Sequence, residues 1–215
     1  MGKYKRGVEM MEKILQVAKT SFRNHGYKES TIERIANLAG VPASLVTYYF
    51  KKEEFLLRIY RDYWLSIIAL IDREAGKQCE NKFQWYLLFT RIFYSSLVSE
   101  TCNKDIYWEI FLRRLAHSLL REYNDPLIME IIAEFGLETD ETVILHCMQA
   151  EYGARREVLF HNYINMHPER DKETFYFLAC IAVRMAGLDK GETKRHIDAT
   201  EALYEKMGKP IVPLL

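Results

Sequence analysis

Apolar residues recur at every third or fourth position along nearly the whole chain, and this period limits the possible folds more than any other feature. In the first stretch, Ile14, Ala18 and Phe22 fall on one face of a helix. No segment alternates apolar and polar residues in the way that is typical of a strand. The sequence therefore predicts an all-α protein.

Glycine and proline residues divide this pattern into separate helices. Gly26 is expected to end the first helix, since glycine readily takes the left-handed conformation found there. Ser30 and Glu33 have the spacing of a capping box at the start of the second. The predicted helices that follow the first are 32–39, 43–49, 53–75, 81–99, 105–122, 126–135, 141–166, 170–187 and 192–207.

Composition excludes several classes of protein. Of 215 residues, 49% are hydrophobic and 28% charged, values that fit a globular chain and argue against disorder. No apolar run approaches the roughly 18 residues that a membrane span needs, so we expect no membrane segment and a cytoplasmic protein. The four cysteines form no CxxC pair, and there is no HxxxH, HExxH or glycine-rich phosphate loop. We therefore expect no metal site, no cofactor and no enzymatic activity.

The net charge of zero conceals an uneven distribution. Residues 1–62 hold 12 Lys/Arg and 7 Asp/Glu, a net of +5, which leaves 18 and 23, a net of −5, for residues 63–215. A basic N-terminal part on an acidic remainder indicates a polyanionic partner for that part.

The two short helices 32–39 and 43–49 flank a tight turn at Gly40, which is the arrangement of a helix-turn-helix. The second helix of such a unit enters the major groove of DNA. Its residues suit that task, because Ala43, Ser44 and Thr47 are small, and Leu45 could touch a thymine methyl group. The phenols of Tyr48 and Tyr49 and the ammonium groups of Lys51 and Lys52 suit backbone phosphates. On these features alone, an ordinary helical hairpin remains an alternative.

The order and spacing of residues from about 10 to 60 resemble the DNA-binding region of the tetracycline-repressor (TetR) family. The matching elements are Ile14-Leu15, Ala18, Phe22, Gly26-Tyr27, Ser30-Thr31-Ile32, Ile35-Ala36, Ala39-Gly40-Val41, Tyr48-Tyr49-Phe50, Glu54 and Leu56. The resemblance implies a three-helix DNA-binding domain, 1–52, packed on a helical ligand-binding and dimerisation domain, 53–215. It also implies a homodimeric regulator, usually a repressor, that binds a palindromic double-stranded operator in the bacterial nucleoid and is released by a small-molecule effector.

The resemblance further assigns roles to single positions. It places Ser30 and Thr31 at a phosphate where the first helix of the motif opens. It places Pro42, Ala43, Ser44, Leu45 and Thr47 toward bases or backbone, and Tyr48 and Tyr49 toward phosphate. The chain departs from the family pattern at Ser44, often Gly, at Thr47, often Tyr, and at Glu53, where Lys is favoured. Lys52 could supply the charge that Glu53 lacks, although its direction differs by about 100° on a helix.

For the effector, the resemblance implies a pocket among the central helices of the second domain. The candidate lining residues are Tyr63, Trp64, Ile67, Phe89, Phe93, Trp108, Phe111, His117 and Tyr152. Plain core packing is the alternative for each of them. The segments 141–166 and 170–187 are the implied dimer surface, with an apolar stripe of Phe175, Leu178, Ile181, Ala182 and Met185. Intramolecular packing explains any single residue of that stripe equally well.

Three functions remain to be compared. The first is a ligand-responsive regulator, and the second is an architectural or cell-division protein that binds DNA without an inducer. The third, an enzyme or carrier that has lost DNA binding, is disfavoured by the intact Tyr48-Tyr49-Phe50 run and the paired lysines. A pocket in the second domain would favour the first function, and a filled core the second.

Overall fold

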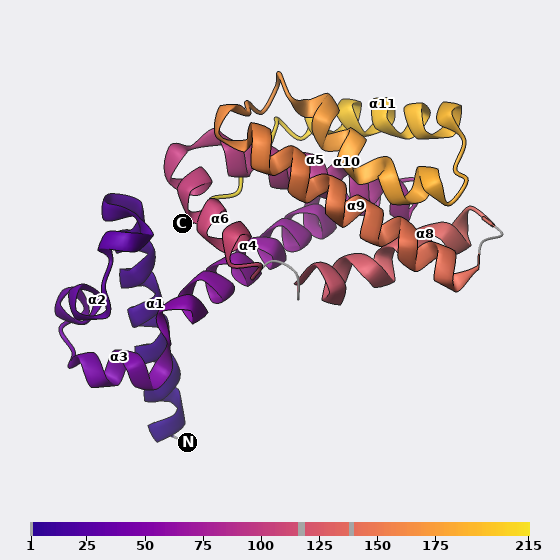
Figure 1. Ribbon diagram of the computed structural model, residues 1–215. Helices are drawn as coiled ribbons and strands as arrows, with labels where there is room; N and C mark the ends of the chain where they lie inside the picture. Colours follow the sequence, from indigo (N-terminus) through magenta and orange to yellow (C-terminus); the bar gives the residue numbers. More distant parts are fainter. Residues whose placement is uncertain (1, 116–118, 138–139) are drawn as a thin grey trace. The chain divides into compact units, whose positions relative to one another are not determined.

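The computed structural model describes residues 2–115, 119–137 and 140–215 (Figure 1). Within these ranges the chain forms helices and irregular segments and no strand, which confirms the predicted all-α class. The chain divides into two compact units: a first unit of residues 1–63, 100–116 and 213–215, and a second unit of residues 64–99 and 117–212. The functional division expected after residue 52 stays a prediction.

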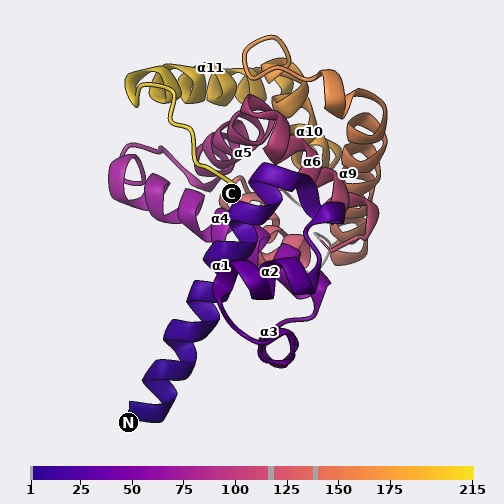
Figure 2. The same cartoon turned by 90° about the vertical axis from the view of Figure 1, so that its left-hand side faces the viewer.

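The first unit contains α1 (Gly2–Glu29), α2 (Ile32–Ala39), α3 (Ala43–Tyr49), the start of α4 (Lys52–Glu74) and α6 (Thr101–Leu112). Helix α1 packs against α2 and α6, and α2 packs against α3. Figure 2 shows α2 and α3 together on one side of α1. The apolar stripe predicted from the sequence is buried here: Ile14, Ala18 and Phe22 are inaccessible to solvent, and Phe22 meets Phe55 edge to face.

The second unit is built around α5 (Lys82–Ser99), which packs against α8 (Asp125–Glu134), α10 (Lys172–Met185) and α11 (Lys190–Lys206). Helix α5 is buried along nearly all of its length, including polar residues such as Arg91 and Ser95. Helix α9 (Glu141–Asn162) lies beside α10 (Figure 1) and continues into a 3₁₀ turn, Tyr163–Asn165. A π-helical turn, Leu120–Asn124, leads directly into α8.

Buried charges tie these helices together. Arg91 of α5 has no solvent exposure, so its charge requires partners. It donates to Glu201 of α11 over 2.6 Å and stacks 4.3 Å from the ring centre of Tyr204. A second network joins Tyr86 of α5 to Glu151 of α9 over 2.7 Å.

One predicted helix differs clearly from the observed one at both of its ends. The helix expected over 105–122 begins at Thr101 and ends at Leu112. Arg114 has a φ of 57°, a left-handed conformation that ends a helix. Arginine has no preference for this conformation, so the residue type does not predict it. Among the described residues of the expected segment, α6 and the π turn are separate elements.

Candidate functional site

Local hydrogen bonds fix the geometry of α2, the turn and α3. Thr31 caps α2, because its hydroxyl accepts from the amide of Arg34 over 3.1 Å. Gly40 ends the helix with a left-handed φ of 67°. Pro42 then precedes the first turn of α3, where a missing N–H costs little. The predicted capping box was thus wrong by one residue, since Thr31 rather than Ser30 is the cap.

Ser30 lies inside the first unit. Its side chain is fully buried, donates to the carbonyl oxygen of Gly26 over 2.8 Å and accepts from Ser21 over 2.7 Å. The Ser30 hydroxyl therefore does not face solvent, contrary to the phosphate-facing place that the resemblance gave it. Thr31, next in the chain, is exposed.

The outer face of α3 is open to solvent. Val46 is its buried anchor, whereas Ser44, Thr47 and Tyr48 are exposed, and Tyr48 keeps 79% of its accessible surface. The Thr47 hydroxyl donates to the carbonyl oxygen of Ser44 over 3.1 Å. Pro42 is exposed as well, and Ala43, Leu45 and Tyr49 are half-buried. Sequence reasoning missed Leu38 at the end of α2, an apolar side chain with 57% exposure.

The two lysines that follow α3 differ in their surroundings. Lys51 is exposed. Lys52 bends back, donates to the carbonyl oxygen of Lys28 over 3.2 Å and lies 4.6 Å from the ring centre of Tyr27. Partial burial lowers the pKa of Lys52 below its ordinary value. Lys51 is therefore the lysine whose charge is presented to solvent.

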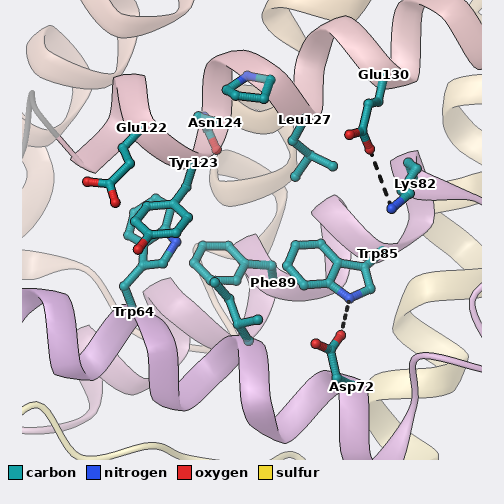
Figure 3. A pocket seen from close by; sticks show the side chains of 12 residues that line it. Trp64, Asp72, Lys82, Trp85, Phe89, Glu122, Tyr123, Asn124, Leu127 and Glu130 are labelled. Atoms are coloured by element: carbon teal, nitrogen blue, oxygen red, sulfur yellow. Dashed lines mark hydrogen bonds and ion pairs between the residues drawn. The ribbon is translucent and has the colours of Figure 1, made fainter.

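The second unit contains a cavity of about 360 Å³ between α4, α5, the π turn and α8 (Figure 3). That volume lies at the lower end of the range for small-molecule sites. The lining residues are Trp64, Ile68, Asp72, Lys82, Trp85, Phe89, Glu122, Tyr123, Asn124, Pro126, Leu127 and Glu130.

Aromatic rings form one continuous surface in this cavity. The ring centres of Trp64 and Phe89 are 4.7 Å apart, and Trp85 stacks on Phe89 at 5.7 Å. Tyr123 approaches Trp64 at 6.0 Å. The indole N–H of Trp85 donates to Asp72 over 3.2 Å, so this carboxylate is held beside the rings.

The predicted pocket residues fall into several groups. Trp64 and Phe89 line the cavity; Phe93 and Ile67 are buried beside it in the second unit without lining it. Tyr63, Trp108 and Phe111 belong to the first unit, where Trp108 stacks on Phe111. Tyr152 donates to Asp125 outside the lining. His117 lies outside the described residues.

Most of the polar lining was missed by sequence reasoning. Trp85 gave a signal, since it precedes Phe89 by one helical turn and shares its face. Asp72, Glu122 and Glu130 gave none, because each is an ordinary surface carboxylate until the fold brings the segments together. Asn124 is buried and joins the cavity to the polar network, donating to the Tyr86 hydroxyl over 3.1 Å.

The stripe expected at a dimer surface is mostly internal. Phe175, Leu178 and Ala182 are fully buried within the second unit. Of the remaining stripe residues, Ile181 is half-buried and Met185 is exposed. Two apolar side chains outside the stripe, Phe160 of α9 and Phe177 of α10, are also exposed.

Two searches bear on other kinds of site. No cluster of three His, Cys, Asp or Glu side chains suited to a metal ion occurs in the part of the chain that the structure describes. No helix there is both long and apolar enough to cross a bilayer.

Comparisons with known proteins agree with this architecture. The chain is 25% identical over 134 residues to the fatty acid metabolism regulator protein of Bacillus subtilis (strain 168), covering 60% of this chain and 68% of that protein. The crystal structure of RolR in complex with the ligand resorcinol is similar in fold, with a TM-score of 0.67 and 14% identity over 99% of this chain and all of that one. Residues 14–59 match the model of bacterial regulatory proteins of the tetR family. This match covers the segment that holds α2, the turn and α3, so the similarity to the tetR family rests on the helix-turn-helix part of the chain.

Proposed function

We propose that the protein is a ligand-responsive transcriptional repressor that binds a palindromic operator as a homodimer and is released by a small molecule. The observation that carries the proposal is the open face of α3, with Ser44, Thr47 and Tyr48 exposed on a helix that its turn and Val46 hold in place. A helix held in this way can enter the major groove without first being ordered.

The proposed DNA contacts follow the exposure of the side chains. Residues toward the bases or the adjoining backbone are Pro42, Ala43, Ser44, Leu45 and Thr47, and residues toward phosphates are Thr31, Tyr48, Tyr49 and Lys51. Ser30 supports Thr31 from inside through its bonds to Gly26 and Ser21. Lys52 contributes to the packing of the unit around Tyr27.

The cavity supports a ligand-responsive role over an architectural one. An architectural protein needs no space in its second unit, whereas this one holds about 360 Å³ lined by four aromatic side chains. Helix α4 offers a route for the response. It begins three residues after α3 ends, and its later part carries Trp64, Ile68 and Asp72 of the cavity lining. An effector that binds better to the DNA-free form must weaken operator binding, and the operator must weaken effector binding by the same factor.

Selection of preferred sites from random double-stranded DNA, followed by fluorescence anisotropy, tests the DNA-binding part. We expect a palindromic site whose half-sites are about one DNA turn, roughly 34 Å, or a multiple of it apart. Thr47→Ala should change which operator variants are preferred, while Asp198→Asn, on the surface of α11, should leave the preference unchanged. Equal affinity for all sequences would contradict a regulator with a defined operator.

Release is tested by titrating small molecules against the protein with and without its selected operator. The coupling requires a weaker apparent affinity for the molecule when operator is bound. A molecule that binds equally well in the two cases is not the effector, however tightly it binds.

A further inference from the structure

The lining of the cavity combines aromatic faces with negative charge. Asp72, Glu122 and Glu130 bring three carboxylates, and Lys82 brings the single ammonium among the lining residues, so the formal balance is two negative charges. Figure 3 shows Asp72 on one side of the rings and the two glutamates on the other. A molecule lying on the rings is therefore approached by carboxylates from both sides.

The Lys82 ammonium and the neutral indole N–H of Trp85 both have partners within the lining. The Lys82 ammonium lies 3.4 Å from the carboxylate of Glu130, and the indole N–H of Trp85 donates a hydrogen bond to Asp72. A carboxylate or phosphate entering the cavity would meet like charges with these two donors committed elsewhere. The electrostatics thus oppose an anionic ligand.

The rings favour the opposite charge. The face of an aromatic ring is negative, and indole attracts a cation more strongly than phenol or benzene does. Trp64, Phe89 and Trp85 form a connected set of rings through separations of 4.7 and 5.7 Å. Trp64 and Phe89 are themselves almost fully buried, which fixes the positions of their rings.

From these contacts we infer that the cavity takes an organic cation: an amine, guanidinium or quaternary ammonium group carried on an apolar body of one or two rings. The inference deepens the proposed function, on which it rests for the biological role of the ligand. The apolar body lies against Leu127 and the rings, while the charged end pairs with a carboxylate of the lining.

Three probes of nearly the same shape and different charge test this directly. They are 4-phenylbutylamine, a cation at neutral pH, 4-phenylbutan-1-ol, which is neutral, and 4-phenylbutyrate, an anion. Isothermal titration of the full-length protein should show the amine binding at least about tenfold more tightly than the alcohol, with the acid weakest. Quenching of tryptophan fluorescence gives a second readout, since two of the three tryptophans line the cavity.

Isosteric variants assign the effect to the carboxylates. The double variant Asp72→Asn with Glu122→Gln should lower the affinity for the amine about tenfold and change that for the alcohol by less than about twofold. Asn can still accept the bond from Trp85, so the ring surface stays in place. Asp198→Asn, which removes a carboxylate on α11 outside the cavity, serves as the matched control, and circular dichroism confirms that each variant is folded.

The outcomes separate this inference from the proposed function. If the alcohol or the acid binds as tightly as the amine, or if the double variant binds the amine unchanged, the inference is overturned. If the acid or the alcohol binds more tightly than the amine and also weakens operator binding, the proposed regulator function is retained and the inference of a cationic ligand is rejected. If the amine binds in the expected order but leaves operator affinity unchanged, the ligand class is supported and the regulatory role of the cavity fails.

Discussion

At the scale of single residues, the hydroxyl of Tyr86 is the meeting point of three other polar side chains. Asn124 and Arg155 donate to it over 3.1 and 2.6 Å, and it donates to Glu151 over 2.7 Å. Burial raises the pKa of Tyr86 well above its ordinary value, so the group keeps its proton and its donor role. Glu151 also accepts from the backbone amide of Ala182 in α10 over 3.2 Å.

Tyr86→Phe should therefore destabilise the protein. It removes the hydroxyl and leaves buried groups of Asn124, Arg155 and Glu151 with fewer partners, at a cost of about 1–3 kcal/mol in the free energy of unfolding. Urea denaturation followed by circular dichroism measures this. Tyr48→Phe is the control, because the Tyr48 side chain is largely exposed. Equal stability of the two variants would mean that the network contributes little.

The two lysines after α3 should differ in their effect on DNA binding. Lys51→Ala should make the salt dependence of operator affinity less steep by about one unit of slope, because one phosphate contact is lost. Lys52→Ala should leave the slope nearly unchanged, because its ammonium is held at Lys28 and Tyr27. Anisotropy titrations over a series of salt concentrations measure both. A larger change in slope for Lys52→Ala than for Lys51→Ala would show that Lys52 turns toward DNA and supplies the positive charge that is missing at Glu53.

At the scale of helices and turns, Gly40 decides how α2 is followed by α3. Its φ of 67° is unfavourable for residues with a Cβ, and a Cβ built there meets nothing within 4 Å. Gly40→Ala should thus cost about 1–2 kcal/mol through the backbone alone. Gly40→Asn should cost less, since Asn tolerates this conformation. Thermal unfolding of both variants tests the order, and equal losses would point to a lost contact instead.

The same scale shows how far the sequence alone could reach. Helices 32–39 and 43–49 were predicted with their observed bounds. Gly40 ends the first and Pro42 precedes the second, and both residue types have known preferences for these positions. The end of α6 was not predicted, since it depends on a left-handed arginine, Arg114. Of the cavity lining, Trp64 and Phe89 were predicted, on the basis of the pocket that the resemblance implied. The carboxylates were not, because their proximity depends on the packing of segments distant in the chain.

At the scale of the whole molecule, the exposed side chains of α9 and α10 predict a homodimer. Phe160, Phe177 and Met185 keep 54%, 60% and 56% of their surfaces, which is unusual for large apolar residues on neighbouring helices. Light scattering should give twice the 25.5 kDa mass of the chain at micromolar concentration. Phe177→Glu should shift this toward the single-chain mass, whereas Ile211→Glu, in the C-terminal segment, should not. A wild-type protein of single-chain mass would contradict the prediction.

The π turn at Leu120–Asn124 has a consequence for how such a cavity can change over evolutionary time. A π turn is an α-helix that carries one extra residue. Deleting one residue there would restore a regular helix and redirect the side chains of the turn itself, because the wider turn is what sets their present directions. Glu122 and Tyr123 would then leave the lining, although no residue of α4 or α5 had been replaced. Two descendants of one ancestor could therefore recognise different molecules after the loss of a single codon. Every lining residue outside the turn would remain the same.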